Sequence, residues 1–365
     1  MVSLQSKAVY IHIPFCNHIC SYCDFAKMYY NKKWVNSYLD SLEYEINSNY
    51  NNEIINTIYI GGGTPTSLDL NELRKLFNII KLFKKNKNIE YTIEANIENI
   101  TEDKIKLCKE YGINRISIGI QTLNDKYIKY LNRYHEKEEV FNKIHMIKKY
   151  IDNINIDLIY GINNQTLEEL EEDIDYVLKL DVKHISTYSL IIEPHTKLYI
   201  DNVSNIDEDI DFDMYNLICN KFKKYGYIHY EISNFSKEGY ESKHNLTYWN
   251  NLEYYGFGLG ASGYINGIRY DNTKSLNEYL NHNYIINSHK LNDKEKIEEE
   301  FILGLRKING INKKDFFHKY NMDIYNVSNV KDLIQNNKLI DNKEHIYINP
   351  EYIYTSNDIL VEFID

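Results

Sequence analysis

The chain has 365 residues, a length that predicts about two domains. Hydrophobic residues make up 43% and charged residues 26%, which is typical of a globular protein and excludes a disordered chain. The 42 basic and 53 acidic residues give a net charge of −11, which argues against nucleic acid as a partner, because nucleic-acid binding needs a basic surface.

The sequence predicts neither a membrane span nor a signal peptide. No apolar run reaches the ~18 residues that a membrane span needs. The first residues lead into a strand-like stretch and not into the apolar region of a signal peptide. We therefore expect a cytoplasmic protein without a transmembrane segment, and a peripheral membrane contact stays open.

The first half of the chain alternates short β-branched runs with longer amphipathic stretches. This alternation predicts βα units around a parallel sheet. Six such units are fewer than the eight of a closed barrel, so we predict an α/β fold with a (βα)6 partial TIM barrel over residues 1–235. The predicted strands are Ala8–Ile13, Thr57–Ile60, Ile89–Glu94, Arg115–Gly119, Ile154–Ile159 and His184–Leu190, and the predicted helices are Trp34–Ile46, Leu70–Phe83, Asp103–Tyr111, Val140–Tyr150 and Leu167–Leu178.

The pattern changes in the last third of the chain. Residues 236–290 are richer in glycine, contain a strand-like piece at Ile265–Tyr270 and are interpreted as a connecting segment. Residues 291–365 are mostly helical in pattern, and the pieces Ile346–Ile348 and Tyr352–Tyr354 predict a terminal hairpin. Together these features predict a small, mostly helical, winged-helix-like C-terminal domain. Its predicted helices are Lys294–Leu305, Lys313–Tyr320 and Val330–Asn336.

Three cysteines lie close together directly after the first predicted strand, with the spacing Cys16-x3-Cys20-x2-Cys23. Clustered thiolates in a reducing compartment favour zinc or an iron–sulfur cluster over disulfides. A structural zinc site needs four protein ligands, so His12 or His18 would have to complete it. Three thiolates suffice for a [4Fe–4S] cube, whose fourth iron then stays open to a small molecule that carries an amino group and a carboxylate.

Polar or backbone-exposing residues follow all six predicted strands. In a βα barrel, functional groups gather at this carboxyl end of the strands. The three glycines from Gly61 to Gly63 let backbone N–H groups approach a ligand, because no Cβ stands in the way. Arg133 is suited to a bidentate contact with a ligand carboxylate. The alternatives are a plain turn for the glycines and surface charges for the side chains. The further candidates at these strand ends are Glu94, Gln121, Asp157 and Ser189.

The CxxxCxxC spacing is the signature of the radical S-adenosylmethionine (SAM) superfamily, which this chain resembles. Other motifs are similar to the coproporphyrinogen dehydrogenase branch: YIHIPFC at 10–16, GGGTPT at 61–66, SIGIQT at 117–122, DLIYG at 157–161 and YEISNF at 230–235. The resemblance implies a partial barrel of radical SAM type, a [4Fe–4S] cluster, bound SAM and an electron donor for the cluster. It assigns the cluster to Cys16, Cys20 and Cys23, and SAM contacts to Tyr10, Tyr22, Gly62, Gly63, Thr64, Glu94, Gln121, Arg133, Asp157 and Ser189.

Two groups of proteins within the coproporphyrinogen dehydrogenase branch differ at positions that can be compared with this sequence. Oxygen-independent coproporphyrinogen III oxidases carry a fourth cysteine two residues after the third, where this chain has Phe25, and a longer N-terminal segment. HemW-like heme chaperones carry phenylalanine there and an HNxxYW motif, which covers residues 244–249 of this chain. The resemblance therefore implies heme as a ligand and an apo-hemoprotein as the client. A coproporphyrinogen oxidase, or a radical enzyme with another substrate, is the alternative.

The HNxxYW segment has side chains that suit heme. The imidazole of His244 can ligate heme iron axially, and Tyr248 and Trp249 offer flat amphipathic area against a porphyrin. The alternative for His244 is a histidine that is satisfied within the fold or solvated. The sequence assigns no catalytic residue and leaves open whether SAM is cleaved, but the departures from the oxidase pattern argue against coproporphyrinogen oxidase activity.

Overall fold

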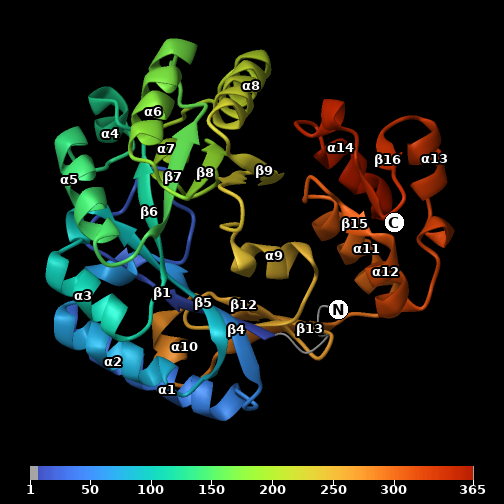
Figure 1. Cartoon of the computed structure of the whole chain (residues 1–365). Helices are drawn as coiled ribbons and strands as arrows, with labels where there is room; N and C mark the ends of the chain where they lie inside the picture. The colour runs from blue at the N-terminus through green and yellow to red at the C-terminus, as the bar shows by residue number, and fades with distance from the viewer. Residues whose placement is uncertain (1–6, 365) are drawn as a thin grey trace.

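The computed structural model describes residues 7–364 (Figure 1). A 12-stranded sheet forms the larger part, in the order β14-β13-β12-β11-β1-β4-β5-β6-β7-β8-β10-β9. Its six central strands are parallel and curve into a partial barrel, which confirms the predicted α/β fold. These strands are β1 (Lys7–Ile13), β4 (Ile54–Gly62), β5 (Lys84–Asn96), β6 (Arg115–Gln121), β7 (Asn153–Tyr160) and β8 (His184–Ser189).

Helices cover the outside of the curved sheet (Figure 1). Their apolar sides pack on alternate strand residues such as Ile116 and Ile118, which are fully buried, and so the outward face of each strand is apolar. Two of the helices begin at a capping box, with Asp69 and Glu72 on α2 and with Thr166 and Glu169 on α6. The helices are α1 (Lys32–Asn49), α2 (Leu70–Ile80), α3 (Glu102–Glu110), α4 (Asp125–Tyr130), α5 (Lys137–Lys148), α6 (Leu167–Lys179), α7 (Lys197–Ile200) and α8 (Glu208–Lys224).

The glycine-richer segment after residue 236 adds four strands to this sheet. Strand β11 pairs in parallel with β1, and β12, β13 and β14 follow as an antiparallel edge. The strand-like piece Ile265–Tyr270 is broken by a turn at Asn266 and Gly267, both of which have positive φ. The elements of this region and of the loops are β2 (Phe15–Cys16), β3 (Met28–Tyr29), β9 (Ile228–Glu231), β10 (Asn234–Ser236), α9 (Lys243–Trp249), β11 (Tyr254–Phe257), β12 (Ser262–Ile265), β13 (Ile268–Asn272), α10 (Leu276–Leu280) and β14 (Ile285–Lys290).

The C-terminal part has a hydrophobic core of its own, around Phe301, Phe316 and Ile346. The predicted hairpin is wrong in its pairing: β17 pairs with β16 and β15, while Pro350–Tyr352 forms a 3₁₀ helix. Proline has no N–H for a strand ladder, and the Asn349 side chain caps the 3₁₀ turn instead. The elements are α11 (Asp293–Gly304), β15 (Ile311–Asn312), α12 (Lys313–Tyr320), α13 (Val330–Gln335), β16 (Leu339–Asp341), β17 (His345–Ile348) and α14 (Asn357–Leu360).

Helix α9 lies between the barrel and the C-terminal helices (Figure 1). Arg269 of β13 forms a two-pronged ion pair with Glu299 of α11, with a closest N···O distance of 2.6 Å. Lys319 of α12 donates to the backbone oxygens of Asn250 and Asn251, which follow α9, at 2.9 and 3.0 Å. The two parts are therefore joined by charged contacts at this seam. No helix within residues 7–364 has the length and apolar character needed to span a bilayer.

Glu45 of α1 is a buried carboxylate that shapes the pH dependence of stability. It is 2% exposed and accepts hydrogen bonds from Tyr279 Oη at 2.6 Å, Gly258 N at 2.9 Å and Asn272 Nδ2 at 2.6 Å. Burial raises the pKa of Glu45 to about 7. Because the unfolded chain releases this proton near its ordinary pKa of about 4.5, the folded state loses stability as the pH rises from there through 7.

We expect Glu45→Gln to flatten this pH dependence. At one pKa unit for 1.36 kcal/mol, the wild-type free energy of unfolding falls by about 3 kcal/mol over that range on account of Glu45, and the glutamine variant lacks this contribution. Urea denaturation at about pH 5 and about pH 8 measures it. The control is Glu43→Gln, an exposed glutamate of the same helix. Equal pH slopes for wild type and Glu45→Gln would contradict the prediction.

Candidate functional site

The cysteine loop leaves β1 at the carboxyl end of the barrel. Strand β2 pairs with β3 across the loop, which places Cys16 in the interior and leaves Cys20 and Cys23 half-buried. Burial raises the pKa of Cys16 to about 12 and that of Cys23 to about 11; the negative charge of Cys20 adds to both shifts, and the positive charge of Lys27 opposes them. The three thiols therefore lie near one another. Thr64 supports the first of them, since its Oγ1 lies 3.7 Å from Cys16 Sγ.

The donor set of this loop fits an iron–sulfur cube better than a zinc ion. Within residues 7–364, no three His, Cys, Asp or Glu side chains lie close enough together to hold a single metal ion. A [4Fe–4S] cube takes each thiolate at a different iron, so its thiols are spread more widely. His12, a candidate fourth zinc ligand, has both ring nitrogens bonded, with Nδ1 3.0 Å from Tyr10 Oη and Nε2 2.6 Å from the Ala26 oxygen. Burial lowers the pKa of His12 to about 4, so the imidazole is neutral.

The glycines at the end of β4, Gly61 to Gly63, pack directly against the cysteine loop and its neighbours. A Cβ on Gly62, which has a φ of +116°, would lie 2.7 Å from the His12 ring, and a Cβ on Gly63 would lie 2.8 Å from Cys16 Sγ. The Gly62 N–H donates to Glu94 Oε2 at 3.0 Å. These glycines are therefore required for close packing between the turn and its neighbours, and ligand contact by their N–H groups stays a prediction.

Two carboxyl groups face the inside of the barrel near its carboxyl end. Glu94 accepts from Tyr59 Oη at 2.8 Å, and burial raises the pKa of Glu94 to about 7. Asp157 accepts from Asn155 Nδ2 at 2.8 Å and from Ser117 Oγ at 3.2 Å, and burial raises its pKa also. Both groups are oriented by neighbours on the strands and have lone pairs left for the hydroxyl groups of a ligand.

Arg133 lies against the cysteine loop. It is 5% exposed; its Nη1 lies 3.4 Å from Cys20 Sγ, and its Nη2 donates to Asn96 Oδ1 at 3.1 Å and to the Gly119 oxygen. Its Nε is buried and has no hydrogen-bond partner in the described part of the chain. Tyr22 is adjacent, since its hydroxyl interacts with both Cys20 and Arg133. The structure therefore brings three predicted site residues together, with Arg133 lying against Cys20 and Tyr22 of the cysteine loop.

Two further predicted site residues stand out, Gln121 by its backbone conformation and Ser189 by its hydrogen-bond partner. Gln121 has a φ of +73° at a bulge between Gly119 and Gln121, a backbone conformation that is unfavourable for a residue with a Cβ and is often found at functional sites. Ser189 ends β8 and donates to Asp211 Oδ1 of α8, beside Gly161. The hydroxyl of Ser189 is therefore bonded to α8, and no hydrogen bond joins it to the cysteine loop among residues 7–364.

His244 begins the HNxxYW segment, which forms α9. Glu90 of β5 accepts from the backbone N–H groups of Lys243 and His244, at 3.0 and 2.9 Å, and so fixes the start of the helix. His244 is 1% exposed, with Nδ1 2.8 Å from Thr57 Oγ1 and Nε2 2.8 Å from Tyr248 Oη. Burial lowers the pKa of His244 to about 3, so the ring is neutral. Coordination of heme iron by His244 requires that one of these two bonds be replaced.

An apolar cavity of about 470 Å³ lies beside α9, at the seam with the C-terminal helices. Its volume falls in the roughly 300–1,000 Å³ range of small-molecule sites. The indole Nε1 of Trp249 is buried and has no partner within residues 7–364. Sequence reasoning missed the residues that β13 and α11 contribute, because only the tertiary contact brings them to α9. The lining includes Tyr248, Trp249, Leu252, Tyr254, Arg269 and Leu303.

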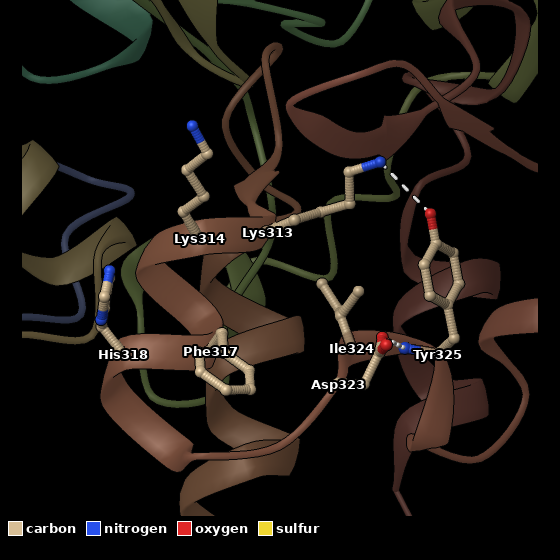
Figure 2. A pocket seen from close by; sticks show the side chains of 7 residues that line it. All are labelled: Lys313, Lys314, Phe317, His318, Asp323, Ile324 and Tyr325. Atoms are coloured by element: carbon tan, nitrogen blue, oxygen red, sulfur yellow. Dashed lines mark hydrogen bonds between the residues drawn. The ribbon is translucent and has the colours of Figure 1, made fainter.

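A second cavity, of about 300 Å³, lies on the C-terminal part between α12 and the 3₁₀ turn at Ile324–Asn326. Figure 2 shows Lys313 turned toward Tyr325, whose hydroxyl it reaches at 3.2 Å, while Lys314 points away from it. Phe317 forms part of the wall. None of the residues lining this cavity was predicted as a site residue, and none of them lies in the cysteine loop or in α9.

Comparison with known proteins agrees with this geometry. The family model of the radical SAM superfamily matches residues 10–177, and that of the HemN C-terminal domain matches residues 291–351. In fold, the chain is similar to coproporphyrinogen III oxidase (HemN) from Escherichia coli, with a TM-score of 0.86 and 20% identity over 98% of this chain and 90% of that one. The fold and the cysteine loop thus define a radical SAM protein with a HemN-type C-terminal domain, a class that uses a [4Fe–4S] cluster and SAM.

Relatives of known name show to which family within the radical SAM class the chain belongs. The heme chaperone HemW of Bacillus subtilis (strain 168) is 38% identical over 98% of this chain and 99% of its own length. The heme chaperone HemW of Lactococcus lactis is also 38% identical, over 99% of this chain and 98% of its own length. The chain belongs to the HemW family of heme chaperones, as the HNxxYW motif and Phe25 predict.

Proposed function

We propose that this protein is a heme chaperone that binds heme beside α9 and delivers it to an apo-hemoprotein. One observation carries the proposal: the helix formed by the HNxxYW motif lines an apolar cavity of about 470 Å³. The relatives from Bacillus subtilis and Lactococcus lactis are named heme chaperones, which supports heme as the ligand. Delivery needs a site that releases its ligand, and a seam between two packed parts of a chain opens more readily than a continuous core.

The cluster and SAM belong, in this proposal, at the carboxyl end of the barrel. Cys16, Cys20 and Cys23 would each bind one iron of the cluster, and the fourth iron would be left for SAM. Arg133 lies beside Cys20, and its Nε, which has no hydrogen-bond partner among residues 7–364, is available to the SAM carboxylate. When bound and reduced by an electron donor, the cluster supplies one-electron chemistry. The other residues proposed as SAM contacts are Tyr10, Tyr22, Gly62, Gly63, Thr64, Glu94, Gln121, Asp157 and Ser189.

Heme belongs beside Trp249 and Tyr248 in this proposal. The two rings offer flat area, and Leu252 and Leu303 supply apolar contact with the porphyrin. The positive charge of Arg269 stands at the cavity wall but is paired with Glu299. Of the two bonded nitrogens of His244, Nε2 is the one held by a residue of the cavity, so His244 would ligate heme iron through Nε2 once Tyr248 Oη leaves it.

We expect Trp249→Ala to weaken heme binding by roughly tenfold or more, because the variant loses a large buried aromatic contact of about 2 kcal/mol with the porphyrin. Heme titration of the anaerobically reconstituted protein, followed at the Soret band, measures the dissociation constant. Trp34→Ala is the matched control, since Trp34 is the chain's other tryptophan and lies exposed on α1.

Transfer is the second part of the test. Mixing the heme-loaded protein with an apo-hemoprotein should move the Soret band to that of the client. Equal heme affinity for wild type and Trp249→Ala would contradict the cavity assignment. Absence of heme binding in wild type, together with conversion of coproporphyrinogen III to protoporphyrinogen, would contradict the chaperone proposal and favour the oxidase.

A further inference from the structure

The interior of the barrel is polar, and one layer of it is fully hydrogen-bonded. Side chains of paired parallel strands point to the same face, so Ser117, Asn155 and His184 form one inward row across β6, β7 and β8. Asn155 Nδ2 donates to Ser117 Oγ at 2.7 Å, and Asn155 Oδ1 lies 2.6 Å from His184 Nδ1. His184 Nε2 lies 2.8 Å from Tyr230 Oη. This layer satisfies its own polar groups.

The next row of inward side chains, nearer the amino end of the barrel, does not satisfy its own polar groups. Thr92, Arg115 and Asn153 are register neighbours on β5, β6 and β7. We call these three residues the floor row. Each has a buried polar atom without a hydrogen-bond partner in the described part of the chain: Thr92 Oγ1, Arg115 Nε and Asn153 Oδ1. Three adjacent unsatisfied groups in one row are a strong contrast to the bonded layer above.

Arg115 is the exceptional member of the floor row. It is 2% exposed, and its side chain makes no hydrogen bond and no ion pair of 4.0 Å or less with any residue from 7 to 364. A buried guanidinium without a partner costs several kcal/mol, so natural proteins pair such a group. Its planar fork of N–H donors matches the two oxygens of a carboxylate.

The charges around Arg115 favour an added anion. Its positive charge lowers the pKa of both Glu94 and Asp157, against the larger effect of their burial, yet neither carboxylate reaches it as an ion pair. Two further neighbours, His184 and His244, are held neutral by burial, and the charge of Arg115 lowers their pKa as well. The guanidinium therefore has no direct counterion from the strands or from α9.

We propose that the floor row binds a carboxylate group. The planar guanidinium of Arg115 donates two hydrogen bonds to this carboxylate, and Thr92 Oγ1 donates a further one. The Asn153 amide adds a third donor after a half-turn that exchanges its oxygen and nitrogen. The carboxylate comes from a heme propionate or from a free small acid. A heme propionate as the source of the carboxylate rests on the proposed function. Its path to the floor row is short, because Tyr248 lines the α9 cavity and bonds His244, which lies beside Arg115.

The experiment compares heme with heme dimethyl ester, whose propionates are uncharged. We expect Arg115→Gln to bind heme roughly 10- to 100-fold more weakly than wild type, as a charge-assisted hydrogen-bond pair implies. The ester should bind wild type as weakly as heme binds the variant, and the variant should not distinguish the two ligands. Arg74→Gln is the control, since Arg74 is a half-exposed arginine on α2. Thr92→Val removes one donor at nearly constant volume and serves if Arg115→Gln does not fold.

A second arm uses acetate at constant ionic strength and follows the thermal unfolding of wild type and both variants. Stabilisation by acetate that is lost in Arg115→Gln or Thr92→Val, with equal affinities for heme and its ester, assigns the site to a free acid. If wild type binds no heme, the proposed function fails, and the acetate arm alone decides the floor row. If neither heme affinity nor acetate stabilisation changes in either variant, the row binds only water and the proposal is wrong.

Discussion

Cys20→Ser is expected to abolish the iron–sulfur cluster. A [4Fe–4S] cube on three thiolates loses one of its anchors, and serine oxygen is a poor ligand for iron in such a cluster. After anaerobic reconstitution, wild type should hold about four irons and about four sulfides per chain, and the variant well under one of each. Iron and sulfide analysis with visible absorbance measures this, and SAM binding should disappear together with the cluster.

Cys219→Ser is the matched control for this prediction. Cys219 is a half-buried thiol of α8 outside the cysteine loop, and burial raises its pKa to about 11 as it does that of Cys23. It should keep the full cluster, which separates loss of a ligand from the general effect of the substitution. A colourless wild-type protein that holds zinc or no metal would overturn the cluster, and with it the assigned SAM site.

Arg133→Lys is expected to weaken SAM binding by roughly 10- to 100-fold without loss of the cluster. Lysine keeps the positive charge but lacks the planar fork with which Arg133 reaches Cys20 Sγ and Asn96 Oδ1 at once, and it has no Nε for the SAM carboxylate. Equilibrium dialysis of SAM with reconstituted protein of equal iron content measures the change.

The control for this variant is Arg74→Lys, which changes a half-exposed arginine whose ion pair with Glu110 is long, at 3.8 Å. Its SAM affinity should equal that of wild type. Unchanged affinity in Arg133→Lys would remove Arg133 from the SAM site. A loss of iron in that variant would instead assign Arg133 to support of the cysteine loop.

Local pattern was sufficient for the elements that depend on nearest neighbours along the chain. The helix at Lys313–Tyr320 and the start of the strand at Arg115 were predicted at their observed positions, since a cap or an apolar period is written into the sequence there. The hairpin at Tyr352–Tyr354 was wrong, because strand pairing depends on partners that sequence order does not reveal. The four strands β11–β14 escaped prediction as barrel strands for the same reason.

The features of the candidate site also divide into those that the sequence indicates and those that only the structure shows. The cysteine triplet, Glu94 and Arg133 can be named as candidates from the sequence, because chemistry restricts which residues bind a cluster, a hydroxyl group or a carboxylate. His244 could be named as well, but that both its nitrogens are bonded, to Thr57 and Tyr248, was not predictable. Hydrogen bonds between residues 187 positions apart exist only once the strands are in register.

The sequence by itself therefore determined the class of this protein: a βα partial barrel, a cysteine triplet suited to a cluster, and a motif shared with heme chaperones. Tertiary structure alone decided that Arg115 lies beside Thr92 and Asn153 with no ion-pair partner among residues 7–364, and that α9 and α11 line a cavity. The physical reason is that residue type fixes what a side chain can bind. Burial and strand register, which sum over the whole fold, fix which of those bonds the protein has already made.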